Sequence, residues 1–99
     1  MPFEIQYAAE SEEHLRGLTA NQKAQVLDGI AEQLVHQPNV PTRNRKSMRA
    51  NKLANWELRI GTLRVYYDVQ EQPQPVVHIR AVGIKQGNRV FVHGEEVKW

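Results

Sequence analysis

The sequence predicts an α/β (α+β) fold in two layers, with an N-terminal strand and a helical hairpin packed on a small antiparallel sheet. Two patterns carry this prediction. Apolar residues recur at helical spacing over residues 8–36, and apolar and polar residues alternate over most of residues 56–93. The length of 99 residues and the hydrophobic content of 40% fit one compact domain that covers residues 1–99.

The N-terminal segment is expected to form a strand and then a short helix. Over residues 3–7 apolar and polar side chains alternate, which is typical of a strand with one buried face. Residues 8–18 predict a helix, because acidic residues follow Ser11 near its start and Leu15 and Leu18 supply apolar contacts.

The second helix has clearer signals at both ends. Thr19 and Gln22 have the spacing of a capping box, in which each side chain bonds the backbone N–H of the other residue. Apolar residues follow at helical intervals, and Pro38 is expected to end the helix at about His36. Because the link between the two helices is short, they should form an antiparallel hairpin.

The segment that follows is basic and poor in apolar residues. Residues 43–52 hold five positive charges and no negative charge, and we expect a loop or an irregular connection there. A run of charges is usually a solvated connection. Its position before a strand that contains Trp56 also suits a surface that binds nucleic acid.

The rest of the chain predicts an antiparallel sheet. Four strands are expected, over residues 56–60, 63–69, 76–84 and 89–93. Gly61 and Thr62 separate the first two, and glycine at the first position of a two-residue loop favours a type II′ hairpin.

This hairpin fixes a register in which Arg59 lies directly opposite Arg64. All apolar side chains of the two strands then share one face, and the two arginines lie on the other, uncovered face. Like charges directly opposite each other are destabilising, so something should compensate. The compensation is a bound phosphate, splaying of both side chains into water, or pairing with Glu57 and Asp68.

Composition limits the possible chemistry. The absence of cysteine excludes disulfides, thiolate metal sites and a cysteine nucleophile, and it suits the cytoplasm. Every apolar run is far shorter than the ~20 residues that a bilayer requires, so no membrane association is expected. Because no carboxylate cluster lies near the basic segment, a metal-dependent nuclease is disfavoured, and we expect neither a metal ion nor another cofactor.

Charge is distributed unevenly along the chain. Residues 1–40 carry two basic and six acidic residues, a net charge of −4, whereas residues 41–99 carry eleven basic and five acidic residues, a net charge of +6. This polarity suggests one surface for a basic partner and another for an anion such as nucleic acid.

Cleaving RNA without a metal would require two groups that transfer protons. One takes the proton of the 2′-hydroxyl and the other returns a proton to the leaving 5′ oxygen, while cations stabilise the charged phosphorane. The titratable candidates are Glu57, Tyr66, His78 and His93. His78 also fits a core histidine among apolar strand residues, and His14 and His36 are expected to be ordinary surface residues.

The order of these elements, together with three segments, resembles the RelE/ParE superfamily of bacterial toxins. The segments are residues 56–61 (WELRIG), 63–69 (LRVYYDV) and 81–85 (AVGIK), and the second is similar to the family's YRVxY strand. The resemblance covers nearly the whole chain. It implies a toxin of a type II toxin–antitoxin pair, held inactive by a small cognate antitoxin, and the acidic helical hairpin would suit a partner with basic stretches.

Members of this superfamily differ in their targets. RelE-like members are ribosome-dependent endoribonucleases that cut mRNA with basic residues on this sheet face, and the resemblance implies this activity, with the ribosome and mRNA as partners. The alternative that it leaves open is a ParE-like inhibitor of DNA gyrase, or a toxin-fold binding protein without catalysis.

The resemblance also implies residues of the site. Arg64 matches the family's recurrent strand arginine, Arg59 a basic position on the preceding strand, and Lys85 a basic position after Val-Gly. Two residues depart from the pattern, because Glu57 stands where members have Lys and Phe91 where they have a Tyr that stacks on the substrate or assists proton transfer. Glu57 could act as a base, and His93 or Tyr66 could replace the missing hydroxyl. The predicted catalytic residues are Arg64, Arg59, Lys85, Glu57, Tyr66 and His93. The predicted RNA-binding residues are Arg43, Arg45, Lys46, Arg49, Lys52 and Phe91.

Overall fold

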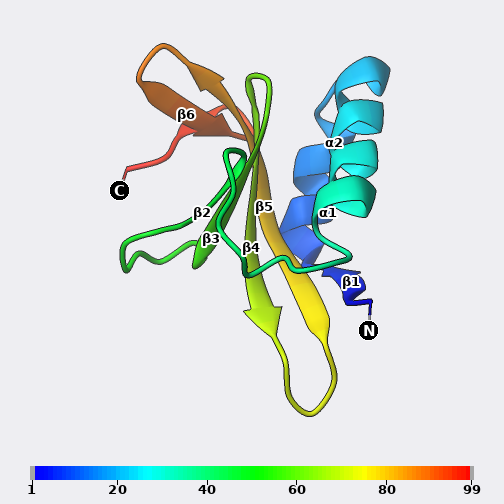
Figure 1. The fold of residues 1–99 in the computed structure, drawn as a ribbon. Helices are drawn as coiled ribbons and strands as arrows, with labels where there is room; N and C mark the ends of the chain where they lie inside the picture. Colours follow the sequence, from blue (N-terminus) through cyan, green and yellow to red (C-terminus); the bar gives the residue numbers. More distant parts are fainter. Residues whose placement is uncertain (1, 99) are drawn as a thin grey trace.

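The computed structural model describes residues 2–98, and these residues form two layers (Figure 1). Two helices, α1 (Ala9–Arg16) and α2 (Ala20–Gln33), lie on one face of a seven-stranded sheet. The strands are β1 (Glu4–Tyr7), β2 (Arg45–Ser47), β3 (Trp56–Ile60), β4 (Leu63–Gln70), β5 (Val76–Gln86), β6 (Arg89–Val92) and β7 (Glu95–Glu96). The predicted α+β fold, a strand and a helical hairpin on an antiparallel sheet, is therefore confirmed.

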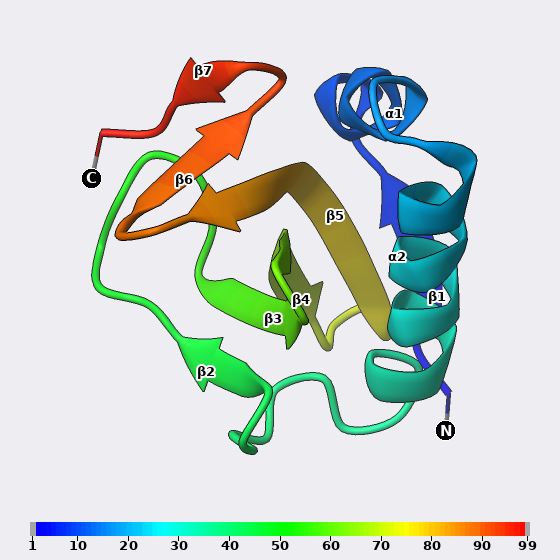
Figure 2. The ribbon, with the colours of Figure 1, turned by 90° about the horizontal axis from the view of Figure 1, so that it is seen from above.

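The sheet is antiparallel except at one edge. Its strands follow the order β2-β3-β4-β5-β6-β7, and β1 pairs in parallel with the first half of β5. Tyr66 pairs with Ala81 whereas Tyr67 pairs with Ile79, so Arg80 is an extra residue, and β5 bends in this region (Figure 2). The sequence predicted neither the parallel pairing of β1 nor the short strand β7.

The predicted hairpin register is confirmed at every position. Between β3 and β4, Trp56 pairs with Tyr67, Arg59 with Arg64, and the two residues flanking the loop with each other. Gly61 has a φ of 59°, and Thr62 is not among the residues with positive φ. A positive φ at the first loop position alone fits a type II′ turn, which glycine permits.

The two helices begin where the sequence places them. The capping box of α2 is present, because Thr19 Oγ1 accepts from the N–H of Gln22 at 3.1 Å and the N–H of Thr19 donates to Gln22 Oε1 at 3.0 Å. However, α2 ends at Gln33, about three residues before the predicted end at His36. The chain turns away from the helix here, and Gln37 adopts a positive φ of 53°.

The main core lies between the helices and the sheet. Its buried members are Leu15, Val26, Ile30, Leu34, Leu58, Leu63, Val65, Tyr67, Val77, Ile79 and Val82. Tyr67 stacks against Trp56, with ring centroids 6.2 Å apart, and its hydroxyl donates to the carbonyl of Pro38 at 2.7 Å. One tyrosine thus fixes the chain that leaves α2 against the sheet.

The opposite face of the sheet is not open, which corrects the expectation of an uncovered face. A second cluster covers part of it, formed by Ala54, Tyr66, Ala81 and Val90 with Met48, Leu53, Val92 and Val97 packed against them. The loop before β3, the strand β6 and the residue after β7 supply the covering side chains. Figure 2 shows the loop and β6 on the side of the sheet away from the helices.

The basic segment is also more ordered than expected. Arg45 to Ser47 form β2, which pairs with β3 so that Lys46 lies opposite Glu57. A loop follows over residues 48–55, and its ends are joined by a bond from the N–H of Met48 to the carbonyl of Asn55 at 2.8 Å. Charge alone suggested a solvated connection, and the pairing of β2 could not be read from its composition.

Candidate nucleic-acid site on the sheet

One face of the sheet gathers six predicted residues. The pairing of β2, β3 and β4 places Lys46, Glu57 and Tyr66 in one row across the strands. Arg59 and Arg64 form the next row toward the hairpin loop. Lys85 points to the same face, since it alternates with Ala81 and Gly83 along β5, and it is exposed. The structure therefore brings together charged groups from Lys46 to Lys85, which are 39 residues apart in sequence.

Glu57 is the buried carboxylate of this face, only 6% exposed. It lies 3.7 Å from Lys46 Nζ and 3.4 Å from Arg59 Nε, and both cations are about half exposed at the side chain. A buried carboxylate is costly unless cations and hydrogen bonds accompany it. The pairing that the sequence left open for Arg59 is thus with Glu57, whereas Asp68 pairs with Arg80 at 2.9 Å.

Tyr66 lies opposite Glu57 in the pairing of β3 with β4, and its side chain contacts the Glu57 carboxylate. Its side chain is fully buried. Burial first, and then the charge and hydrogen bond of Glu57, raise the pKa of the Tyr66 hydroxyl. The phenol therefore keeps its proton and donates to the carboxylate. Because Tyr66 is enclosed beneath the surface, it fits a role in holding Glu57 better than one in contact with a substrate.

Arg64 is held by the hairpin that carries it. Its Nη1 donates to the carbonyls of Gly61 at 2.7 Å and Leu63 at 2.8 Å, and the residue is 7% exposed. The two arginines are thus stabilised differently, Arg59 by a carboxylate and Arg64 by main-chain carbonyls. A cation held in this way is fixed in position beside the open part of the face.

A cavity opens beside this row. Its volume is about 590 Å³, and it is lined by Lys46, Ser47, Met48, Arg49, Ala50, Asn51, Glu57 and Val90. Two predicted RNA-binding residues, Lys46 and Arg49, thus lie beside Glu57. Arg43 and Lys52 are exposed in the loops on either side of β2.

Arg45, one of the predicted RNA-binding residues, lies apart from the other residues of this face. It pairs with Leu58 and so points to the helical face, where it is 8% exposed. Its Nη1 donates to the carbonyls of Gln33 and His36. A cation at the C-terminal end of a helix satisfies carbonyls that lack helical partners, so Arg45 stabilises the end of α2.

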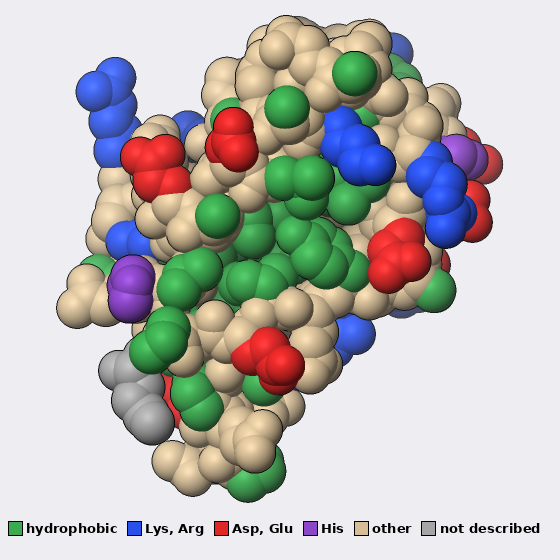
Figure 3. Space-filling view, turned by 90° about the vertical axis from the view of Figure 1, so that its right-hand side faces the viewer, with side chains coloured by type: hydrophobic (Ala, Val, Ile, Leu, Met, Phe, Trp, Pro, Cys, Tyr) green, Lys and Arg blue, Asp and Glu red, His purple; other side chains and the backbone are tan. Residues whose placement is uncertain are grey.

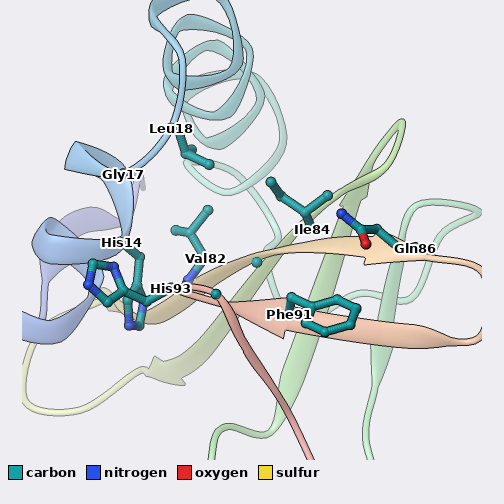
Figure 4. Close-up of a pocket in the computed structure, with 10 residues that line it drawn as sticks. His14, Gly17, Leu18, Val82, Ile84, Gln86, Phe91 and His93 are labelled. Carbon is teal, nitrogen blue, oxygen red and sulfur yellow. Dashed lines mark hydrogen bonds between the residues drawn. The ribbon is translucent and has the colours of Figure 1, made fainter.

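Phe91 and His93 lie on the helical side of the sheet, away from Glu57. Phe91 pairs with Ile84, so their side chains share a face. Both residues line a separate cavity of about 540 Å³ beside the end of α1, together with His14, Gly17, Leu18, Val82, Gly83, Ile84, Gln86 and Gly94 (Figure 4). Neither is therefore placed to replace a catalytic hydroxyl beside Glu57.

His14 has a structural role that sequence reasoning missed. At the bend of β5 neither β1 nor β6 pairs with Val82, and the Nδ1 atom of His14 accepts the N–H of Val82 at 3.2 Å. Burial and then the nearby His93 lower the pKa of His14, while Glu10 and Glu13 act in the opposite direction. His14 lies on the side of α1 that faces the sheet. The charge pattern of the sequence does not distinguish such a histidine from one on the surface.

This contact predicts a pH dependence of stability. Because the pKa of His14 is lower in the folded state, the unfolded state binds a proton more readily. The stabilisation should be complete above the ordinary pKa of 6.5 and should decrease as the pH falls below it. Urea unfolding at several pH values should show this loss in the free energy of unfolding. In His14→Gln the amide oxygen can still accept the N–H of Val82, and the loss at low pH should be smaller. His36→Gln, at an exposed position, should leave the loss unchanged.

Comparisons with known proteins agree with the fold. The structure superposes on a chain of the toxin–antitoxin complex RelBE2 from Mycobacterium tuberculosis with a TM-score of 0.71 and 22% sequence identity. The match covers 86% of this chain and 100% of that one. No protein-family model and no curated protein matches the sequence. The RelE-like fold inferred from sequence is thus found in a solved structure.

No helix within residues 2–98 is long and apolar enough to cross a membrane. Within the same residues, no group of three or more histidine, aspartate or glutamate side chains is arranged to hold a metal ion.

Proposed function

We propose that this protein is the toxin of a type II toxin–antitoxin system and that it is a metal-independent, ribosome-dependent endoribonuclease of the cytoplasm. The observation that carries the proposal is the buried carboxylate of Glu57 beside Arg59 and Arg64 on one sheet face. A base and fixed cations in one place are what RNA cleavage by the 2′-hydroxyl requires.

The proposed reaction uses these groups in named roles. Glu57 takes the proton of the 2′-hydroxyl, and the 2′ oxygen attacks the phosphorus. Arg59 and Arg64 stabilise the charge on the non-bridging oxygens. The bond from phosphorus to the 5′ oxygen breaks, and Lys46 or Lys85, both exposed on this face, returns a proton to that oxygen. The products are a 2′,3′-cyclic phosphate and a 5′-hydroxyl.

The helical side suits an antitoxin as partner. Figure 3 shows a broad area of hydrophobic side chains in the middle of one side of the molecule, with charged side chains around it. Partly exposed apolar residues of the N-terminal segment, the helices and their link are Phe3, Ile5, Tyr7, Leu18 and Leu27. Exposed acidic side chains on the two helices are Glu10, Glu12, Glu13, Asp28 and Glu32. An amphipathic segment with basic residues would complement both features.

A direct comparison of targets tests this function. The purified protein is incubated with mRNA alone, with mRNA on programmed ribosomes, and with DNA gyrase and plasmid. We expect cleavage on ribosomes, no loss of supercoiling, and relief of cleavage by the antitoxin encoded beside the gene. Inhibition of gyrase with intact mRNA would contradict the proposal.

A gyrase inhibitor or a non-catalytic binding protein is the second candidate, and one observation favours it. Arg64 is 7% exposed and already bonds two main-chain carbonyls, so a purely structural role accounts for its burial. In that case Arg59 and the exposed lysines would form a binding surface without chemistry.

A further inference from the structure

A single side chain organises the loop that forms the wall of the cavity. Asn51 Oδ1 accepts from the N–H groups of Leu53 at 2.7 Å and Ala54 at 3.0 Å. Its Nδ2 donates to the carbonyls of Arg49 at 2.7 Å and Ala54 at 3.0 Å. These four bonds use the full hydrogen-bonding capacity of a carboxamide. The loop is therefore closed around Asn51.

The same loop is attached to the sheet on both sides. Met48 and Leu53 pack against the second buried cluster, of which Ala54 is a member. The N–H of Asn55 donates to Asp68 Oδ1 on β4 at 2.8 Å. A basic loop with these contacts is a fixed part of the surface and not a mobile connection.

The loop carries two cations that no carboxylate neutralises. Arg49 and Lys52 are both exposed, and within residues 2–98 neither forms an ion pair with Asp or Glu. Arg49 lines the cavity beside Lys46 and Glu57. Arg49 and Lys46 both line this cavity, and a bound anion would offset the repulsion between their positive charges.

We propose that Asn51 is a positioning residue that holds Arg49 and Lys52 in place for the sugar-phosphate backbone of single-stranded RNA. This inference rests on the proposed function, and it names the residue that organises the loop on one side of the proposed site. Long basic side chains lose conformational freedom when they bind, and a fixed backbone beneath them lowers that cost. Asn51 itself does not touch the reacting atoms.

The first arm of the test examines the loop without RNA. In Asn51→Ala, the amides of Leu53 and Ala54 lose their acceptor and should exchange their hydrogens faster than in the original protein. Amides of the main core, such as that of Val65, should keep their protection. Asn21→Ala on α2, at an exposed position, is the matched control and should leave the loop amides unchanged.

The second arm measures binding to a single-stranded oligonucleotide with 2′-O-methyl groups, which cannot be cleaved. We expect Asn51→Ala to weaken binding by about tenfold at low salt and to reduce the slope of log affinity against log salt by about 1.4, the contribution of two phosphate contacts on a single strand. Arg49→Ala with Lys52→Ala should show a similar loss, and adding Asn51→Ala to that pair should change little.

The outcomes separate this inference from the proposed function. Faster exchange together with weaker, less salt-dependent and non-additive binding supports it. Unchanged exchange, unchanged affinity or additive losses would overturn the role of Asn51 while the protein still binds RNA. If the original protein does not bind the oligonucleotide even at low salt, RNA recognition by this wall is wrong, and ribosome-dependent cleavage is judged by its own assay.

Discussion

Replacing Glu57 by glutamine should lower the rate of RNA cleavage by about 10²–10⁴-fold, the range that a positioned general base contributes. The amide has nearly the same shape as the carboxylate and keeps the packing against Tyr66, but it cannot accept the proton of a 2′-hydroxyl. Lys46 and Arg59 lose an anionic partner, and both are exposed enough for water to replace it. The loss should therefore appear in kcat, measured on programmed ribosomes.

Two comparisons make this result specific. Glu32→Gln, at an exposed position on α2, removes the same charge from the opposite layer and should keep the original rate. Urea unfolding should show that Glu57→Gln remains folded. A folded Glu57→Gln protein that cleaves within a few-fold of the original rate would remove Glu57 from the mechanism.

Replacing Arg64 by alanine should abolish growth arrest, with a loss in cleavage of about 10²–10³-fold, the effect of removing one fixed donor from a charged transition state. Its planar guanidinium suits a phosphate better than an ammonium does, so Arg64→Lys should recover only part of the activity. The variant should also be less stable, by about 1.5–3 kcal/mol, because bonds from a charged donor to the hairpin carbonyls are lost.

Arg59→Ala separates loss of chemistry from loss of fold. Arg59 lies on the same face, but its side chain is about half exposed and pairs with the carboxylate of Glu57. It should lose cleavage by a similar factor with a much smaller change in the free energy of unfolding. If both variants remain folded and fully toxic, the phosphate role is wrong and the gyrase-binding alternative becomes the preferred one.

Local patterns predicted the elements and the hairpin because short-range physics determines them. The capping box of Thr19 and Gln22 and the loop at Gly61 depend only on neighbouring residues, and the structure shows both as expected. The alternation around Arg59 and Arg64 fixed their pairing for the same reason. These features placed the main candidate residues on one face.

Long-range contacts decided the rest, and a single sequence carries little signal for them. Arg45 and its neighbour Lys46 have the same charge, yet alternation along β2 sends one to α2 and the other to Glu57. The position of Phe91 depends on how β6 pairs with β5, which places its side chain on the helical side. Part of the cover over Tyr66 comes from a loop in which Asn51 makes four hydrogen bonds.

The end groups of the cleaved mRNA test the central claim most directly. The protein is incubated with programmed ribosomes, and EDTA is then added to stop translation. The termini of the mRNA fragments are analysed, and gyrase supercoiling is assayed in parallel. We predict fragments that end in a 2′,3′-cyclic phosphate and begin with a 5′-hydroxyl, and that are missing with Glu57→Gln. Fragments with a 3′-hydroxyl and a 5′-phosphate, or intact mRNA with inhibited gyrase, would contradict the account.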